Sequence, residues 1–322
     1  MAQHQINITD EDYKKAAIKW RKELLMLPLF ACQDTLKYMT GRPGIRYQEK
    51  VGSASSNAQF APYKADRKSA STTEIKYRTL ETFFGNVVED FEPNQLISTL
   101  LGAGASFIGD GQKSAPDAKL VLSLVAKALG KNLHDVIFTA KRNASGDTTK
   151  DLFNGFTTIA EQEIADNNIS MANGNLLDIK QEVSSANAVD IAKEILYALD
   201  PHLRAENCFL FCDQHFADMY NEGYLLSHSG ISYNTQFDQP YVEGSGKKLT
   251  IAPLASLQGT KKFFVAPKAN MLYGYDSMSD IERIQVDRFA PFILTFSAAM
   301  FFGTQFESID KRRLMVVDMA TE

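Results

Sequence analysis

The feature that most constrains this chain is a polar stretch, residues 52–72, that is rich in Ser, Ala, Lys and Asn. On both sides of it, in residues 45–51 and 73–79, apolar and polar side chains alternate. Alternation with a period of two predicts β-strands. Structureless loops longer than about 12–15 residues are uncommon inside compact domains. We therefore predict a long hairpin arm over residues 45–80 that projects from the body of the protein.

This hairpin arm is basic, although the chain as a whole has 34 basic and 39 acidic residues and a net charge of −5. Residues 42–78 hold eight basic side chains against three acidic ones. Such an excess often marks only a solvated face. On a segment that cannot bury itself, however, it favours an acidic partner surface, and the simplest partner is another copy of the chain. The candidate contact residues between subunits are Phe60, Tyr63, Lys64, Arg67 and Lys68.

The overall composition is that of an ordinary folded protein of one or two domains, with 44% hydrophobic and 23% charged residues among 322. The three cysteines (Cys32, Cys208 and Cys212) are too few for a disulfide scaffold. No run reaches the roughly 18–20 apolar residues of a membrane helix, and the polar start lacks the apolar core of a signal peptide. We expect a cytoplasmic product with no membrane partner.

The remaining patterns predict an α+β fold. A helix over residues 115–142 keeps its apolar side chains at helical spacing, although Gly130 could bend it, and it should lie across a sheet that includes residues 292–302. A helical N-terminal segment should run from Thr9 to about Met39. In the second half we expect helices at 189–199 and 214–221, the latter capped by Asp213 and ended by Gly223. Strands are predicted at 208–212, 262–265, 280–286, 292–302 and 314–319.

No pattern of residues rises to a catalytic signature. The glycines of residues 102–109 have the wrong spacing for a dinucleotide-binding loop. Cys208, Cys212 and His215 have almost the spacing of a metal site, but residues four apart on a strand merely share one face, and no second cysteine pair exists. Cysteine on a buried strand usually acts as a small hydrophobic residue. We therefore expect no cofactor, no metal and no enzymatic activity.

The order of the predicted elements resembles that of a known family. A long basic hairpin is followed by a long helix and then by a Gly-Asp-x-x-x-Asp-Leu-x-x-Gly-hydrophobic run at residues 146–156. A helix–strand–helix unit at 189–221 follows, and Val286-Asp287-Arg288 precedes a long apolar strand and a last strand. Over nearly its whole length the chain resembles the major capsid protein of tailed bacteriophages, a family related to the shells of encapsulins.

The resemblance implies the parts of that fold. Residues 1–44 would form the N-terminal arm and residues 45–80 the extended hairpin loop. Residues 81–187 would form the peripheral domain, with residues 115–142 as its spine helix, and residues 280–322 would supply its return strands. The axial domain would span residues 188–279. Residues 160–185 look like additional material and are expected to form a surface insertion.

The implied function is that of a structural protein that self-assembles, through hexamers and pentamers, into the icosahedral head shell of a tailed phage or prophage. The shell would enclose double-stranded DNA without sequence specificity and end up in the virion. Portal and decoration proteins would be separate partners, as would scaffolding, because no long segment precedes the N-terminal arm. Two alternatives remain open: an encapsulin-type nanocompartment that encloses protein cargo, and an unrecognised cytoplasmic enzyme.

Overall fold

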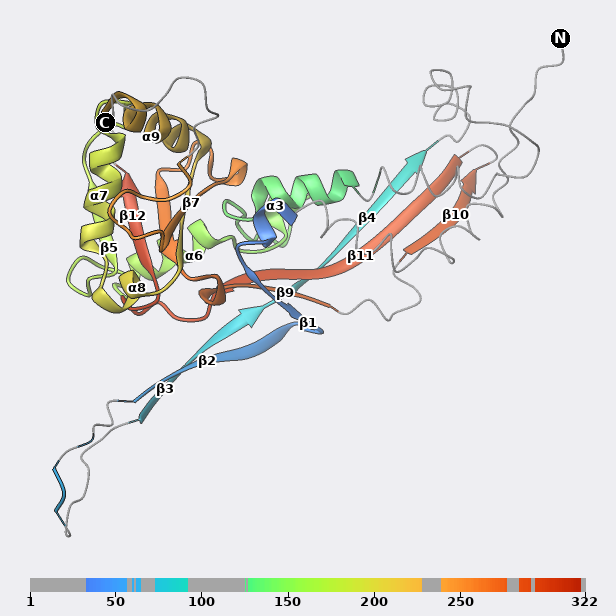
Figure 1. Ribbon diagram of the computed structural model, residues 1–322. Coiled ribbons are helices and arrows are strands. Elements are labelled where there is room, and N and C mark those ends of the chain that lie inside the picture. The colour runs from blue at the N-terminus through green and yellow to red at the C-terminus, as the bar shows by residue number, and fades with distance from the viewer. Residues whose placement is uncertain are drawn as a thin grey trace, which may run out of the picture.

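The computed structural model describes residues 33–56, 60, 62–64, 73–91, 125, 127–227, 239–276, 284–290 and 293–319. These residues form two five-stranded sheets and a separate two-stranded hairpin. Figure 1 shows a compact part, a long sheet that extends away from it, and the hairpin that projects in a third direction. The predicted α+β class is thus confirmed.

The compact part is built on a sheet that we call the body sheet. Its strand order is β5-β12-β8-β6-β7, with β5 parallel to β12, β6 parallel to β7, and the other pairs antiparallel. The strands are β5 (Leu176–Ile179), β6 (Cys208–Cys212), β7 (Leu249–Pro253), β8 (Lys262–Ala266) and β12 (Met315–Met319).

Both faces of the body sheet are buried. Helices α7 (Ala188–Ala198), α8 (Pro201–Ala205) and α9 (Gln214–Ser227) share one apolar cluster with Leu210 and Val265 of the sheet. Helix α6 (Phe156–Ala165) belongs to a second cluster, with Phe211 and Phe264. Because successive side chains of a strand point to opposite faces, a sheet covered on both sides reads as a continuous apolar run, as in β6.

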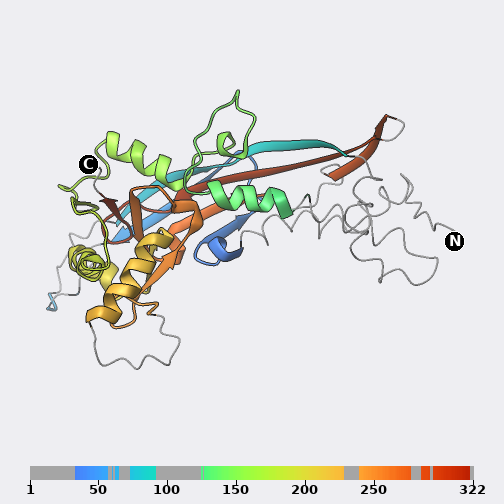
Figure 2. The same ribbon diagram turned by 90° about the horizontal axis from the view of Figure 1, so that it is seen from above.

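The second sheet, which we call the long sheet, is organised around β11 (Ile293–Phe306). Strand β4 (Phe83–Phe91) pairs along one edge of β11. On the other edge β11 pairs first with β10 (Ile284–Ala290) and then with β9 (Met271–Tyr275), to which β1 (Thr40–Pro43) adds in parallel. Seen from above in Figure 2, the three strands β4, β11 and β10 extend well beyond the compact part.

The hairpin arm consists of β2 (Gln48–Ser56) and β3 (Thr73–Glu81), which pair antiparallel from Gln48 opposite Glu81 to Ser56 opposite Thr73. Strand β3 agrees closely with the prediction, whereas β2 begins three residues later than predicted and continues to Ser56, inside the polar stretch. The two strands leave the rest of the molecule as an isolated ribbon (Figure 1). The short elements that remain are α3 (Gln33–Leu36) and the 3-10 turns Thr149–Asp151, Ala255–Leu257 and Lys268–Asn270.

The predicted spine helix ends earlier than expected. Residues 127–136 are helical, and the chain then turns at 137–139 to bury Ile137 and Phe138 completely. The following residues form backbone hydrogen bonds with the segment around residue 150 instead, for example from Lys141 N to Lys150 O. Residues 115–124 lie outside the described part of the chain. The described turns do pack against the long sheet as predicted, since Leu133 and Phe302 share one cluster.

Several other predictions need correction. Residues 160–185 are not a surface insertion, because Ala160 is buried and β5 completes one edge of the body sheet. Helix α9 does not end at Gly223: a Cβ atom there would overlap the Ser185 carbonyl oxygen, so this glycine allows a close approach inside the helix. The helical N-terminal segment, predicted to reach about Met39, ends with α3 at Leu36, and residues 40–43 form strand β1; residues 1–32 of this segment are not among those described.

The predicted domain boundaries cut across the two sheets. Strand β12, from the predicted return strands at 280–322, lies in the body sheet next to β8. Strand β9, from the predicted axial segment 188–279, lies in the long sheet next to β11. Chain segments therefore cross between the two sheets more often than the linear division suggested. Among the described residues, no helix is long and apolar enough to cross a membrane.

Candidate assembly site

The tip of the hairpin arm carries the contact residues that the sequence singled out. Phe60 is 109% and Tyr63 91% exposed, and Lys64 is exposed beside them. Arg67 and Lys68 lie outside the described residues. The three side chains that are described face solvent, and two of them are large aromatic rings that no described part of the chain covers.

A second exposed apolar group follows strand β3 and was not predicted as a contact. Ile75 is 53% and Tyr77 64% exposed, and the two lie on one face because they are two residues apart. Gly52 pairs with Tyr77 across the ribbon, and a Cβ atom on Gly52 would lie 3.0 Å from the tyrosine ring. The alternation of apolar and polar residues predicted both this strand and its apolar face. It did not show that this face stays more than half exposed.

The root of the hairpin arm rests on two glycines that face each other across adjacent strands. Gly274 of β9 pairs with Gly303 of β11. A Cβ atom on Gly303 would overlap the Glu81 carbonyl oxygen, and one on Gly274 would lie 2.8 Å from Thr82 Cγ2. Thr82 N also donates to the Tyr47 carbonyl oxygen at 2.7 Å. The missing side chains thus let the root cross directly over the long sheet.

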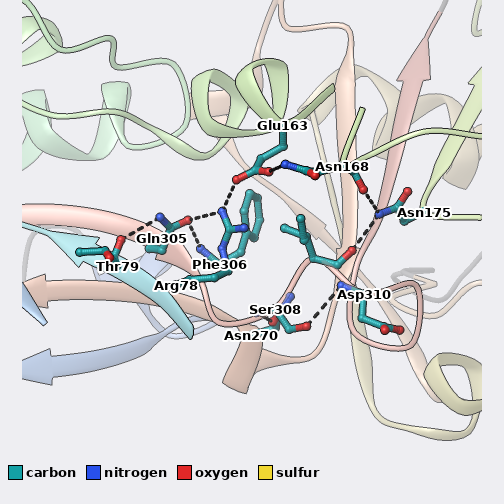
Figure 3. Close-up of polar contacts among 11 residues, drawn as sticks. Arg78, Thr79, Glu163, Asn168, Asn175, Asn270, Gln305, Phe306, Ser308 and Asp310 are labelled. Atoms are coloured by element: carbon teal, nitrogen blue, oxygen red, sulfur yellow. Dashed lines mark hydrogen bonds and ion pairs between the residues drawn. The ribbon is translucent and has the colours of Figure 1, made fainter. Parts of the chain in front are cut away.

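A short distance along β3, Arg78 ties the hairpin arm to the body (Figure 3). Its Nη2 lies 2.6 Å from Glu163 Oε1 of α6 and 3.1 Å from Gln305 Oε1 of β11. Gln305 Nε2 also donates to the Thr79 carbonyl oxygen at 2.9 Å. The Arg78 and Glu163 side chains are each only 16% exposed. The Arg78 Nε is buried and has no hydrogen-bond partner among the described residues.

The acid of this ion pair is itself held in place by an amide network. Asn168 Nδ2 donates to Glu163 Oε2 at 2.8 Å. Asn175 Nδ2 donates to the Asn168 carbonyl oxygen at 3.1 Å and to the Ile309 carbonyl oxygen at 2.8 Å (Figure 3). Asn175 is 3% exposed, so these bonds are shielded from water. The chain from Arg78 to Ile309 therefore connects the hairpin arm, helix α6 and the segment that leads into β12.

The basic excess of residues 42–78 is partly neutralised within the chain. Besides the Arg78 pair, Arg46 Nε lies 3.0 Å from Asp276 Oδ2, whose side chain is 3% exposed. At least two of the basic side chains, Arg46 and Arg78, thus face acids of their own subunit, so not all of the excess is available to a partner. The described basic residue at the tip, Lys64, is exposed.

The described residues contain no group of three or more His, Cys, Asp or Glu side chains that could hold a metal ion. Cys208 and Cys212 are buried, as predicted, and His215 is exposed. Burial raises the pKa of the Cys208 thiol to about 12 and that of Cys212 well above its usual value. Because the thiolate is the reactive form, neither cysteine is set up as a nucleophile.

Comparisons with known proteins bear on the fold of this chain. Neither a protein-family model nor a curated protein matches the sequence. The fold, in contrast, matches solved structures over most of its length. One match is a chain from the procapsid of satellite phage P4, a structure that also includes the size determination (Sid) protein. The TM-score is 0.55 at 10% identity, and the match covers 91% of this chain and 98% of that one.

Two further structures extend the match. The capsid of an empty GTA particle gives a TM-score of 0.56 at 13% identity and covers 90% of both chains. The capsid of cyanophage A-1(L) also gives 0.56, at 11% identity, covering 92% of this chain and 94% of that one. The compact part, the long sheet and the projecting hairpin arm together thus have the fold of phage capsid proteins.

Proposed function

We propose that this protein is a major capsid protein, whose copies assemble into the icosahedral head shell of a tailed phage or prophage and enclose double-stranded DNA. The observation that carries the proposal is the hairpin arm, whose apolar side chains Phe60, Tyr63, Ile75 and Tyr77 are all more than half exposed. The fold likeness to capsid proteins supports it. The function is structural, with no catalytic step.

The energetics favour a partner for the hairpin arm. Ordering each backbone residue costs about 1–2 kcal/mol, and an isolated two-stranded hairpin is marginal in water. Burying exposed rings on a neighbouring subunit would offset part of that cost, at about 25 cal/mol per Å² of apolar surface. Exposed ion pairs from Lys64, Arg67 and Lys68 would add at most about 1 kcal/mol each. The contact recurs in every subunit, so many weak contacts would produce a strong shell.

The charge of the chain suits a DNA container. Its net charge of −5 avoids the strongly basic surface that would bind a polyphosphate tightly. The DNA would accordingly be enclosed without sequence-specific contacts. Portal, scaffolding and decoration proteins would be separate chains, and assembly would take place in the bacterial cytoplasm before the shell becomes part of the virion.

We further propose that the two sheets correspond to the two domains of the capsid fold. The long sheet with the helix at 127–136 would form the peripheral domain, and the body sheet with α7 and α9 the axial domain, next to its copies at the centre of each hexamer or pentamer. Residues 1–44 would form an N-terminal arm that ends in strand β1, where the chain joins the long sheet.

The test reverses the charge at the tip of the hairpin arm. The triple variant Lys64→Glu, Arg67→Glu, Lys68→Glu should fold normally, with unchanged circular dichroism, yet its shells should fail to form or fall apart at moderate salt. The matched control, Lys64→Arg, Arg67→Lys, Lys68→Arg, keeps the charge and should assemble. Sedimentation and electron microscopy read out both variants.

Two results would contradict the proposal. Normal yields of stable particles from the charge-reversed variant would show that the tip does not hold the shell together. The contents of wild-type particles supply the second check. Nuclease-protected double-stranded DNA is expected, whereas particles that hold protein and no nucleic acid would identify a nanocompartment instead.

A further inference from the structure

We propose that Arg78 is a latch that sets the direction in which the hairpin arm leaves the body before the subunit assembles. The latch consists of Arg78 on β3 and its two partners on the body, Glu163 on α6 and Gln305 on β11. Its benefit to the protein rests on the proposed shell function, but the direction of the hairpin arm is a property of the single subunit.

The root of the hairpin arm has the geometry of a pivot. Around Thr82 the chain crosses the paired glycines Gly274 and Gly303 with no side chains in between. A contact at this crossing can fix the position of the root. It lies too close to the pivot, however, to control rotation of the hairpin arm. Arg78 lies four residues further along β3, about 13 Å away at roughly 3.3 Å per residue. A bond at that distance does control the angle of the ribbon.

Polar bonds act together with an apolar contact to hold the hairpin arm at the latch, because Val51, which pairs with Arg78 across the ribbon, is buried in one cluster with Leu80 and Leu272. A hollow of about 630 Å³ borders residues 76–78 of β3, between the loop at 168–175 and residues 307–311. Room therefore exists for the ribbon to move on this side. Within the described part of the chain, the buried Arg78 Nε has no partner, so the guanidinium uses only part of its bonding capacity there. The charged part of this hold thus lies in the bonds of one Nη2 group, beside the bond from Gln305 Nε2 to the Thr79 carbonyl oxygen.

On the body side of the latch, hydrogen bonds hold both partners of Arg78 in place, so the partners define one position for its side chain. Glu163 receives a bond from Asn168, and the buried Asn175 ties the Asn168 backbone to Ile309. Gln305 holds the Arg78 side chain with its oxygen and the Thr79 backbone with its nitrogen. When both partners are held in place, a charged hydrogen bond selects one geometry of the mobile side.

A fixed direction helps assembly by preorganisation. A hairpin arm that already points toward its docking surface loses less freedom when it binds than one that samples many angles. Loosening the latch should therefore leave the contact surface intact while it spreads the direction of the hairpin arm and lowers the rate of shell formation.

The experiment measures the direction in the unassembled full-length subunit. Spin labels on Ala54→Cys in β2 and Glu194→Cys in α7 report the distance between hairpin arm and body by pulsed EPR, in a Cys32→Ser background. Both positions are exposed, whereas Cys208 and Cys212 are buried and stay unlabelled. The variants are Glu163→Gln, Arg78→Glu and the swapped pair Arg78→Glu, Glu163→Arg. The control Glu161→Gln makes the same change at an exposed position of the same helix.

The wild type and Glu161→Gln should give one narrow distance distribution. Glu163→Gln should broaden it about twofold, because a neutral hydrogen bond is roughly half as strong as a charged one. Arg78→Glu should broaden it further, and the swapped pair should narrow it again. Thermal melting checks that each variant is folded. The swapped pair also separates a latch from a simple loss of stability, since a merely destabilised subunit would not regain the narrow distribution.

Two outcomes would overturn the latch: a wild-type distribution that is already broad, or Glu163→Gln and Arg78→Glu distributions that superimpose on the wild type. Neither outcome depends on shells. If the wild type shows the narrow distribution but never assembles, the proposed function fails while the latch stands. If the wild type assembles but its distance distribution does not respond to these variants, the latch fails while the proposed function stands.

Discussion

The body sheet and the long sheet are built from similar apolar strands, but they differ in how far those strands are buried. The body sheet is covered on both faces, and Phe211, Phe264 and Val265 are fully buried there. On the long sheet, Phe84 is 53% and Val88 60% exposed on the face of β4 turned away from the helix at 127–136. The hairpin arm goes further, because most of its described side chains are exposed. Stability is thus concentrated in the compact part, and the extended parts present surface.

The comparison teaches that an apolar alternation identifies a face to be buried but not the molecule that buries it. Strand β8 and strand β3 both carry regularly placed apolar side chains. In β8 the cover comes from helices of the same chain, since Phe263 packs against Phe216 of α9 with ring centroids 5.2 Å apart. In β3 no described part of the same chain covers Ile75, which is 53% exposed.

The largest expected effect tests the self-sufficiency of the compact part. Phe264→Ala removes a ring with no exposed surface that packs against Phe138 and Phe306, with centroids 5.8 and 6.0 Å apart. It should lower the free energy of unfolding by about 3–5 kcal/mol. Phe60→Ala, the matched change at the tip of the hairpin arm, should stay within about 0.5 kcal/mol. Urea denaturation of unassembled subunits measures both, and equal losses would break the comparison.

A smaller effect, on the alkylation rate of Cys208, tests whether water reaches the interior of the compact part. Burial raises the pKa of Cys208 from 9.0 to about 12, so the thiolate fraction at pH 8 falls about a thousandfold. Each thiolate is also roughly 30-fold more nucleophilic, because it is more basic. The two effects together should make alkylation of Cys208 about 30-fold slower than that of an ordinary thiol. Ala54→Cys on the hairpin arm is the control.

The pH dependence of the same reaction sharpens the test. The alkylation rate of Cys208 should keep rising with pH beyond 9, because its thiol stays protonated in the folded state, while the rate at Ala54→Cys should level off near that value. Mass spectrometry after timed iodoacetamide labelling reads both sites. Equal rates in the folded protein would mean that water reaches β6.

The smallest effect on stability is expected on the ribbon of the hairpin arm. Ile75→Ser should change the free energy of unfolding of the unassembled subunit by no more than about 0.5 kcal/mol, because the side chain is already largely in water. It should nevertheless lower the yield of shells, whereas Lys50→Ser on the opposite strand should not. Calorimetry and sedimentation measure the two quantities. A loss of stability near that of Phe264→Ala would show that the ribbon packs on its own body.

Much of the fold follows from local patterns in the sequence. The two strands of the hairpin arm alternate clearly, β6 is a short apolar run, and Asp213 Oδ1 caps α9 by accepting from Phe216 N at 2.9 Å. Strands β7 and β9 were missed, because short buried runs that contain Pro253 or Gly274 lack a clear period. Helix α6 was missed as well, since its first turn carries two threonines, which are weak helix formers.

The candidate site was only partly predictable, for a physical reason. Exposed aromatic residues on a polar segment are visible in the sequence, so Phe60 and Tyr63 could be named. The latch could not be found in this way, because Arg78 meets partners that are 85 and 227 residues away in the chain. Gly223 is a related case: the sequence shows a helix terminator, and only the close approach of Ser185 explains a glycine inside α9.

The length of β11 has a mechanical consequence. Its 14 residues span about 46 Å at roughly 3.3 Å per residue, from the compact part to the far end of the long sheet. Hydrogen bonds between antiparallel strands run perpendicular to the strand direction. A pull along β11, such as tension within the wall of the proposed shell, would therefore load its bonds to β4 and β10 in shear. Many bonds would then have to break together, so this strand is built to carry tension lengthwise.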